Sequence, residues 1–396
     1  MTFEGMWADL LPVGRRADGG YQRFAWTAAD MQCRDWFRAE GARRGMDVET
    51  DRNGNLWAWL GAPGPDAVVT GSHLDSVPGG GAYDGPLGIV SAFAALDELA
   101  ARGRKPTQPV AIVAFSDEEG ARFGVACLGS RLAAGVADPG RTLALTDDDG
   151  TTLADAMRAQ GHDPSHVGPD PQALQRIGLF LELHVEQGRA LDAPVGLSTA
   201  IWPHGRWRYD FLGEGNHAGT TALADRRDPM LSYAMTVLAA RKRARLGGAL
   251  ATFGRVRVNP GGTNAIASAV TGWLDSRAPD EPTLATVVAE IEQQATERAA
   301  RDGVTLTVTA ESVSPEVSFP APTLDWAAGV LGDPPRLPTG AGHDAGVLAA
   351  AGVPTAMLFV RNPTGISHAP SEYAEEADCL AGVAALADLL AAAAYA

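Results

Sequence analysis

Short apolar segments recur along this chain, and each is followed by residues that can bind metals or transfer protons. A helical pattern at 87–101 separates the first two segments. Apolar runs of this length, separated by helices, are typical of parallel strands buried on both faces. The sequence therefore predicts an α/β fold, an open and mostly parallel sheet with helices on both faces. The runs lie at 67–70, 110–115, 177–183 and 356–360.

The pattern changes after Trp202. A half-buried strand at 206–211 begins a compact α+β pattern of about a hundred residues, which we interpret as an insertion with an antiparallel sheet. We therefore predict a main domain formed by residues 1–204 and 318–396, interrupted by a smaller domain at 205–317. The inserted elements are a helix at 230–245, strands at 252–258 and 270–274, a helix at 282–301 and a strand at 305–310.

Composition limits the possible functions. The chain has 396 residues, enough for roughly two domains, and its net charge of −16 argues against a nucleic-acid or anionic-membrane surface. The three cysteines are unclustered and form no disulfide framework or thiolate motif, so we expect three buried small side chains in a cytoplasmic protein. No signal peptide is evident, and the Ala-rich C-terminal segment, interrupted by Asp388, is expected to be too short for a membrane span.

Metal-ligating residue types follow the apolar runs. The sequence GSHLD at 71–75 and SDEEG at 116–120 each lie where the carboxyl end of a strand would meet a ligand. His, Asp and Glu form the ligand set of a zinc- or manganese-type site with an open position, and the spare Glu is a candidate general base. Each residue alone has an ordinary alternative, such as a turn or a helix N-terminus. Their recurrence beyond successive strands favours a metal site. The positions are His73, Asp84, Glu118, Glu119, His184 and His368.

Five motifs resemble those of the amidase/hydantoinase/carbamoylase family. The similarity extends from about residue 5 to the C-terminus. That family includes allantoate amidohydrolases, N-carbamoyl-L-amino acid hydrolases and β-ureidopropionases, and it is related to dinuclear-zinc aminoacylases and peptidases. The resemblance implies a zinc-exopeptidase-like main domain and an inserted domain that serves for dimerisation and as a lid. The motifs are GSHLDS at 71–76, ELHVEQG at 182–188, NHAGTT at 216–221, GAGHDA at 340–345 and GISHAP at 365–370.

The resemblance also implies a role for each site residue. Two divalent metal ions per subunit, zinc or manganese, would be held by two ligand groups that share Asp84. Glu118 would be the general base, and His217 would reach the active site of the partner subunit and polarise the scissile carbonyl. Asp75 would fix the tautomer of His73. The metal ligands would be His73, Asp84 and His184 for one ion and Asp84, Glu119 and His368 for the other; the substrate-binding residues would be Gln187, His217, Asn264 and Arg277.

Some of these residues have alternative interpretations. A surface salt bridge is a common fate for Arg277, and Asn264 lies in a turn-forming sequence. For His343 and Asp344 we favour a hydrogen bond within their loop over a contact with a metal ligand. The chain also departs from the family pattern in the inserted domain, where Ala222-Leu223 replaces Pro-Met, Ala267 replaces Pro and Ser276 replaces Ile. These departures leave the predicted hydrolase chemistry in place and bear on which substrate the protein prefers.

We therefore predict a homodimeric, metal-dependent amidohydrolase that cleaves the ureido C–N bond of a small carboxylate and releases ammonia and carbon dioxide. Allantoate is the favoured substrate, with N-carbamoyl-L-amino acids close behind and N-formyl or N-acyl amino acids third. A dipeptidase or aminopeptidase on the same scaffold is the rival enzyme. A binding protein that has lost catalysis is the rival from another class, and the intact ligand set argues against it.

Overall fold

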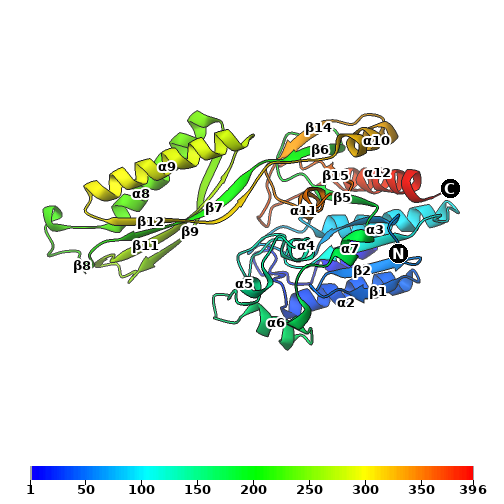
Figure 1. Ribbon diagram of the computed structural model, residues 1–396, viewed down its shortest axis with the longest axis horizontal. Coiled ribbons are helices and arrows are strands. Elements are labelled where there is room, and N and C mark those ends of the chain that lie inside the picture. The colour runs from blue at the N-terminus through cyan, green and yellow to red at the C-terminus, as the bar shows by residue number, and fades with distance from the viewer. Residues whose placement is uncertain (1, 396) are drawn as a thin grey trace. The chain divides into compact units, whose positions relative to one another are not determined.

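The computed structural model describes residues 2–395, and these divide into two compact units (Figure 1). The larger unit contains the residues up to Ala200 and those from Ser318 onward, and the smaller unit is Ile201–Val317. Each unit has its own hydrophobic core. The chain therefore leaves the larger unit once and returns to it once.

A nine-stranded mixed sheet forms the centre of the larger unit, with β14 pairing to β6 beside the strand order β1-β2-β4-β3-β5-β15-β6-β13. Its four inner strands, β4, β3, β5 and β15, are parallel, whereas β2 and β6 flank them in antiparallel orientation. The mostly parallel α/β sheet predicted from the sequence is confirmed. The strands are β1 (Asp47–Thr50), β2 (Leu56–Leu60), β3 (Val68–His73), β4 (Val110–Phe115), β5 (Leu179–Val185), β6 (Val195–Ile201), β13 (Val317–Ser318), β14 (Arg336–Thr339) and β15 (Thr355–Val360).

Helices cover this sheet and bury its apolar strands. Helices α3 and α12 pack against each other and against β3, β5 and their neighbours, whereas α11 contacts β5, β15 and α4. The helices are α1 (Phe3–Leu10), α2 (Ala28–Arg43), α3 (Pro86–Ala101), α4 (Leu128–Ala133), α5 (Pro139–Leu143), α6 (Leu153–Ala159), α7 (Pro171–Gln175), α10 (Ala321–Leu331), α11 (Asp344–Ala350) and α12 (Glu376–Ala394), with a 3₁₀ turn, η1, at Pro164–His166.

The C-terminal helix α12 is longer than the sequence suggested. It spans 19 residues and contains an 18-residue stretch with a mean hydropathy of 1.7, which is long and apolar enough to cross a membrane. Half of that apolar stretch is buried inside the protein, and α12 packs with α3 in the main core. The expectation that this segment is too short for a span was wrong, and its place in the core accounts for its apolar character.

Strand β5 separates the apolar core from the polar residues of the site. Its Leu181, Leu183 and Val185 join the main core with α3 and α12. The alternate residues Glu182 and His184 point to the opposite face, because successive side chains of a strand alternate. On that face Glu182 accepts a hydrogen bond from the backbone N–H of Ala345 in α11. The strand therefore builds the hydrophobic core and carries a candidate metal ligand at the same time.

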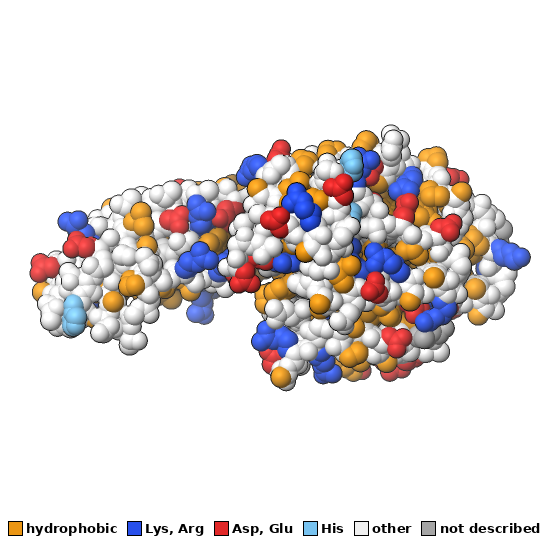
Figure 2. All heavy atoms as spheres, turned by 90° about the horizontal axis from the view of Figure 1, so that it is seen from below, with side chains coloured by type: hydrophobic (Ala, Val, Ile, Leu, Met, Phe, Trp, Pro, Cys, Tyr) orange, Lys and Arg blue, Asp and Glu red, His pale blue; other side chains and the backbone are white. Residues whose placement is uncertain are grey.

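The smaller unit is an antiparallel sheet with helices α8 and α9 against its elements (Figure 1). The strand order is β12-β7-β11-β9, with a short separate ribbon of β8 and β10. Figure 2 shows acidic and basic side chains interspersed on the face in view, without a large area of one sign. The elements are β7 (His204–Leu212), β8 (Asn216–His217), η2 (Leu223–Asp225), α8 (Pro229–Gly247), β9 (Leu250–Asn259), β10 (Ala265–Ile266), β11 (Ala269–Arg277), α9 (Glu281–Arg301) and β12 (Thr305–Ser314).

Candidate metal centre

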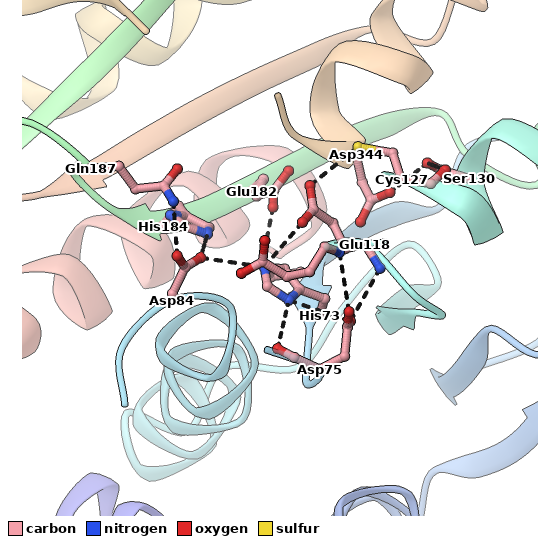
Figure 3. A network of polar contacts seen from close by, with 12 residues as sticks. His73, Asp75, Asp84, Glu118, Cys127, Ser130, Glu182, His184, Gln187 and Asp344 are labelled. Carbon is pink, nitrogen blue, oxygen red and sulfur yellow. Dashed lines mark hydrogen bonds and ion pairs between the residues drawn. The ribbon is translucent and has the colours of Figure 1, made fainter. Parts of the chain in front are cut away.

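Side chains from separate segments of the larger unit meet beyond the carboxyl ends of its parallel strands (Figure 3). His73 is the last residue of β3, and His184 is the penultimate residue of β5. Asp84 lies in the loop before α3, where the next residue, Gly85, has φ +86° and stands against the His73 ring. A Cβ at Gly85 would lie 2.4 Å from His73 Cε1, so this close approach requires glycine.

The ligand-type atoms form two groups that share Asp84. His73 Nε2 and His184 Nε2 lie 3.6 and 3.2 Å from Asp84 Oδ1. His368 Nε2 lies 3.2 Å from Asp84 Oδ2 and 3.7 Å from Glu119 Oε2. Ligand atoms about 2.0–2.1 Å from a tetrahedral ion would be about 3.3 Å apart, close to these separations. The two groups are His73, Asp84 and His184, and Asp84, Glu119 and His368.

The two buried histidines present the nitrogen that a metal needs. His73 Nδ1 donates to the carbonyl oxygen of Asp75 at 3.2 Å, and His184 Nδ1 donates to that of Val185 at 2.8 Å. A carbonyl only accepts, so Nδ1 of each ring carries a hydrogen and the Nε2 lone pair is left for a metal. Both Nε2 atoms are buried without a hydrogen-bond partner. Such orphaned buried nitrogens, aimed at one carboxylate, fit a bound cation.

Buried charges dominate the electrostatics of the cluster. Burial would raise the pKa of Asp84, but His184, His368 and His73 hold it well below its usual range. Burial would lower the pKa of His184, but the Asp84 carboxylate raises it to about 9. Burial, with the charges of Asp84 and Glu118, raises the pKa of Glu119 well above its usual range. Protons therefore compensate the clustered carboxylates when no cation does, and a divalent cation would replace them.

Asp75 connects two strands rather than contacting only His73. Its carboxylate accepts the backbone N–H groups of Glu118 and Glu119, each at 3.1 Å. The same carboxylate lies 3.5 Å from His73 Nδ1, whereas the hydrogen-bond distance to that nitrogen belongs to the Asp75 backbone carbonyl. The hydrogen bond that orients the His73 ring is therefore made to the backbone carbonyl of Asp75 and not to its carboxylate. Its side chain holds the loop after β4 against the end of β3.

Gln187 lies at the second ligand group. Its Nε2 donates to Asp84 Oδ2 at 2.8 Å and to Ser367 Oγ at 3.3 Å, and it lies 3.2 Å from His368 Nε2. The amide N–H, a positive dipole end, therefore lies against two candidate ligands of the second group. The Oε1 atom of Gln187 is buried without a hydrogen-bond partner.

Glu372 is a site residue that the sequence analysis missed. Its Oε1 accepts the backbone N–H groups of Tyr83 and Asp84 at 2.8 and 2.9 Å, and its Oε2 accepts from Ser367 Oγ at 3.0 Å. One buried carboxylate therefore holds the Asp84 loop and the loop carrying His368 together. The signal available in the sequence was its place four residues after His368, and no nearby pattern indicated a partner almost three hundred residues earlier.

A second buried network lies behind His184, on the α11 side of the sheet. Glu182 Oε1 accepts from Ser72 Oγ at 3.0 Å, and Ser130 Oγ donates to Asp344. The His343 ring packs against His184 with 4.5 Å between centroids. His343, for which we favoured a hydrogen bond within its loop, therefore packs directly behind a candidate metal ligand.

The smaller unit brings two predicted substrate-binding residues together and separates the third. His217 and Asn264 line one pocket of about 460 Å³, and the Ala218 N–H donates to the Asn264 carbonyl at 2.9 Å. Arg277 ends β11 at the opposite end from Ala269, paired in register with His204. Its guanidinium donates to both oxygens of Asp275, at 2.8 and 3.1 Å. The pocket residues are Gly215, Asn216, His217, Asn259, Pro260, Asn264, Ala265, Ile266 and Ser268.

Comparison with known proteins gives a consistent result. The model of peptidase family M20/M25/M40 matches residues 69–392. An N-carbamoyl-L-amino acid amidohydrolase of Geobacillus stearothermophilus is 36% identical, covering 97% of this chain and 96% of that protein. An allantoate amidohydrolase of Escherichia coli K12 is 32% identical, covering 96% and 95%.

Solved structures match this chain along nearly its whole length. The structure of AtUAH in complex with (S)-hydroxyglycine superposes with a TM-score of 0.91 at 28% identity, covering 99% of this chain and 96% of that one. An amidase of the hydantoinase/carbamoylase family from Burkholderia vietnamiensis has a TM-score of 0.90 at 29% identity, with the same coverage. The family resemblance predicted from the motifs is confirmed.

The shared position of Asp84 predicts how metal binding responds to its loss. Asp84→Ala removes a ligand from both groups, so we expect the protein to lose both ions, measured as metal content after dialysis. Retention of two ions per chain by Asp84→Ala would contradict the shared role.

Metal binding to the unchanged protein should weaken as the pH falls below about 9, because His184 must then release a proton before it can bind a metal.

The Glu372 contacts predict an effect on metal affinity by a residue outside both groups. Glu372→Ala removes the acceptor for the Tyr83 and Asp84 N–H groups, and we expect an affinity loss of about 10- to 100-fold by chelator competition. Glu372→Gln is the matched control, because its amide oxygen still accepts those N–H groups. Equal losses in the two variants would show that the hydrogen bonds do not orient Asp84.

Proposed function

Because this chain belongs to peptidase family M20/M25/M40 and its named relatives are amidohydrolases, it is a hydrolase of C–N bonds, and we propose that it cleaves the ureido bond of a small carboxylate. The observation that carries this proposal is the pair of ligand groups sharing Asp84, with Glu118 beside them. The proposed products are ammonia, carbon dioxide and the freed amine. One water molecule per ureido group balances this reaction.

Glu118 is the proposed general base. Its side chain is buried, and its Oε2 lies 3.7 Å from His73 Nε2, at the edge of the first ligand group. Burial raises the pKa of Glu118, which strengthens it as a proton acceptor. When bound, two divalent ions would polarise the ureido oxygen and lower the pKa of water. Glu118 would take the proton from the attacking water and give it to the leaving nitrogen.

His217 is the proposed oxyanion stabiliser. The Gly219 N–H donates to His217 Nδ1 at 3.0 Å, so Nδ1 accepts and the hydrogen of the neutral ring lies on Nε2. A neutral imidazole with Nε2–H can donate to a carbonyl oxygen as negative charge develops there. Arg226 ties the loop together by donating to the carbonyls of Ala218 and Thr221. The loop thus holds the tautomer that the proposed role requires.

Arg277 is the proposed partner of the substrate carboxylate. It lies on the face of β11 opposite to the one that carries the buried residues Leu274 and Ser276. Asp275 accepts hydrogen bonds from one edge of its guanidinium group, which orients the planar fork, and a guanidinium fork has the geometry to bind a carboxylate. Gln187, at the second ligand group, would contact the ureido end.

Allantoate is the substrate we propose first, following the resemblance of the motifs and the allantoate amidohydrolase relative. An N-carbamoyl-L-amino acid is the second candidate, favoured by the 36% identity to a relative of that activity. Both carry a ureido group and a carboxylate, so the same residues would serve either. N-formyl and other N-acyl amino acids are the third class.

A homodimer formed through the smaller unit completes the proposal. Helix α8 exposes apolar side chains at helical spacing, with Leu231, Leu238 and Leu246 exposed by 56%, 60% and 64%. The neighbouring β9 is an edge strand of its sheet. An apolar stripe beside an open edge is typical of an interface. His217 and Asn264 would act in the partner subunit. With its three cysteines free and buried, we place the protein in the cytoplasm.

Ammonia release tests the proposed reaction. We expect the protein loaded with manganese or zinc to release ammonia from allantoate, and a chelator to abolish the activity. Glu118→Gln should lower kcat by about 10²- to 10⁴-fold while keeping the metal, because only the proton acceptor is lost. Turnover of N-carbamoyl-L-amino acids alone would keep the reaction and change the substrate. Cleavage of dipeptides without any ureide would refute the proposal.

Mixing two inactive variants tests the contribution of the partner subunit. His217→Ala and Glu118→Gln should each be inactive, but a heterodimer contains one site with both Glu118 and His217. After subunit exchange we expect about a quarter of wild-type activity from random pairing. Leu238→Asp, in the exposed stripe of α8, should give monomers by light scattering and no activity. Full activity of a monomer would overturn the proposed dimer.

A further inference from the structure

Cys127 lies beside Glu118 at the start of α4 (Figure 3). Its Sγ is 3.2 Å from Glu118 Oε1, and the thiol donates to that oxygen. Burial, with the charge of Glu118, raises the pKa of the Cys127 thiol well above its usual range, so the thiol keeps its hydrogen. The sequence predicted only a buried small side chain here, and the structure adds a hydrogen bond to the proposed base.

The backbone around Cys127 is built to keep the thiol in this place. Cys127 has φ +53° and ψ +38°, a left-handed conformation that is unfavourable for a residue with a Cβ. Its N–H donates to the Glu118 carbonyl at 2.5 Å, and the Leu128 N–H donates to the Asp117 carbonyl at 3.1 Å. Successive backbone N–H groups at the start of α4 therefore donate hydrogen bonds to successive carbonyls of the segment that carries Glu118.

The two oxygens of Glu118 have different neighbours. Oε1 accepts from the Cys127 thiol, whereas Oε2 lies 3.7 Å from His73 Nε2 in the first ligand group. Rotation about the last bond of a glutamate side chain is soft, so an unheld carboxylate would sample many orientations. A donor on one oxygen fixes the plane of the group and directs the other oxygen towards the ligand cluster.

We propose that Cys127 is a positioning residue for Glu118, its S–H hydrogen bond to Oε1 holding the carboxylate so that Oε2 takes the proton from the attacking water. The inference rests on the proposed role of Glu118 as the base. A thiol is a weak donor, so it orients the carboxylate without strongly stabilising the ionised form. A stronger donor would hold Glu118 equally well but make it a poorer base.

Infrared spectroscopy tests the hydrogen bond without substrate or metal. The S–H stretching band of Cys127, assigned by its loss in Cys127→Ala, should lie at lower frequency than that of a thiol without an acceptor. In Glu118→Ala that band should move to higher frequency, while the bands of Cys33 and Cys379 stay in place. A Cys127 band that does not respond to Glu118→Ala would overturn the inference, even if the protein hydrolyses ureides as proposed.

Kinetics test the positioning role. Cys127→Ala should lower kcat by about tenfold with little change in KM, because the base is displaced and not removed. Cys379→Ala, which removes an equally buried thiol in α12, is the matched control and should keep full activity. Cys127→Ser retains a donor and should recover part of the lost kcat. A Cys127→Ala protein with wild-type kcat, or with metal content and Tm lowered in proportion to kcat, would contradict positioning.

Discussion

The concentration of buried carboxylates and imidazoles around Asp84 is the constraint on which the larger unit depends. Asp84 faces the buried His73 and His184 and the half-exposed His368, and Glu118 and Glu119 stand beside them, beyond the carboxyl ends of apolar inner strands. Isolated charges in such surroundings are costly, so each must be paired, protonated or bound to a cation. The raised pKa values of His184 and Glu119 and the orphaned Nε2 atoms describe a cluster that a divalent ion would balance.

Carboxylates outside the two ligand groups hold the loops of the site in register. Asp75 joins the loop after β4 to the end of β3, and Glu372 joins the Asp84 loop to the loop of His368. Each accepts N–H groups that a loop would otherwise leave unsatisfied in a buried place. The geometry of the ligands is thus maintained by residues that need not touch a metal. Cys127 would extend the same principle from the metal ligands to the base.

The residues of the smaller unit that we propose to act on substrate lie in two separate places. His217 and Asn264 share a pocket beside the β8–β10 ribbon, and Arg277 lies at the far end of β11. A single strand of nine residues separates them, so one small substrate cannot contact all three within one copy of this unit. A second subunit that supplies His217 and Asn264 would resolve this separation, and the exposed stripe on α8 offers a surface for it.

The sequence by itself determined the mostly parallel sheet and the residue types that could bind a metal, because burial periodicity and strand-end residues are local properties of the chain, and its motifs indicated the hydrolase family by resemblance. It did not determine that Glu372 holds Asp84, that His343 packs behind His184 or that Cys127 donates to Glu118. The sequence also led us to underestimate the length of the apolar segment in α12, whose composition reflects packing on α3. Only the tertiary structure decided these contacts, because chain topology brings Glu372 to Asp84 and His343 to His184 from distant segments, and the left-handed turn at Cys127 returns the start of α4 to Glu118, 9 positions earlier.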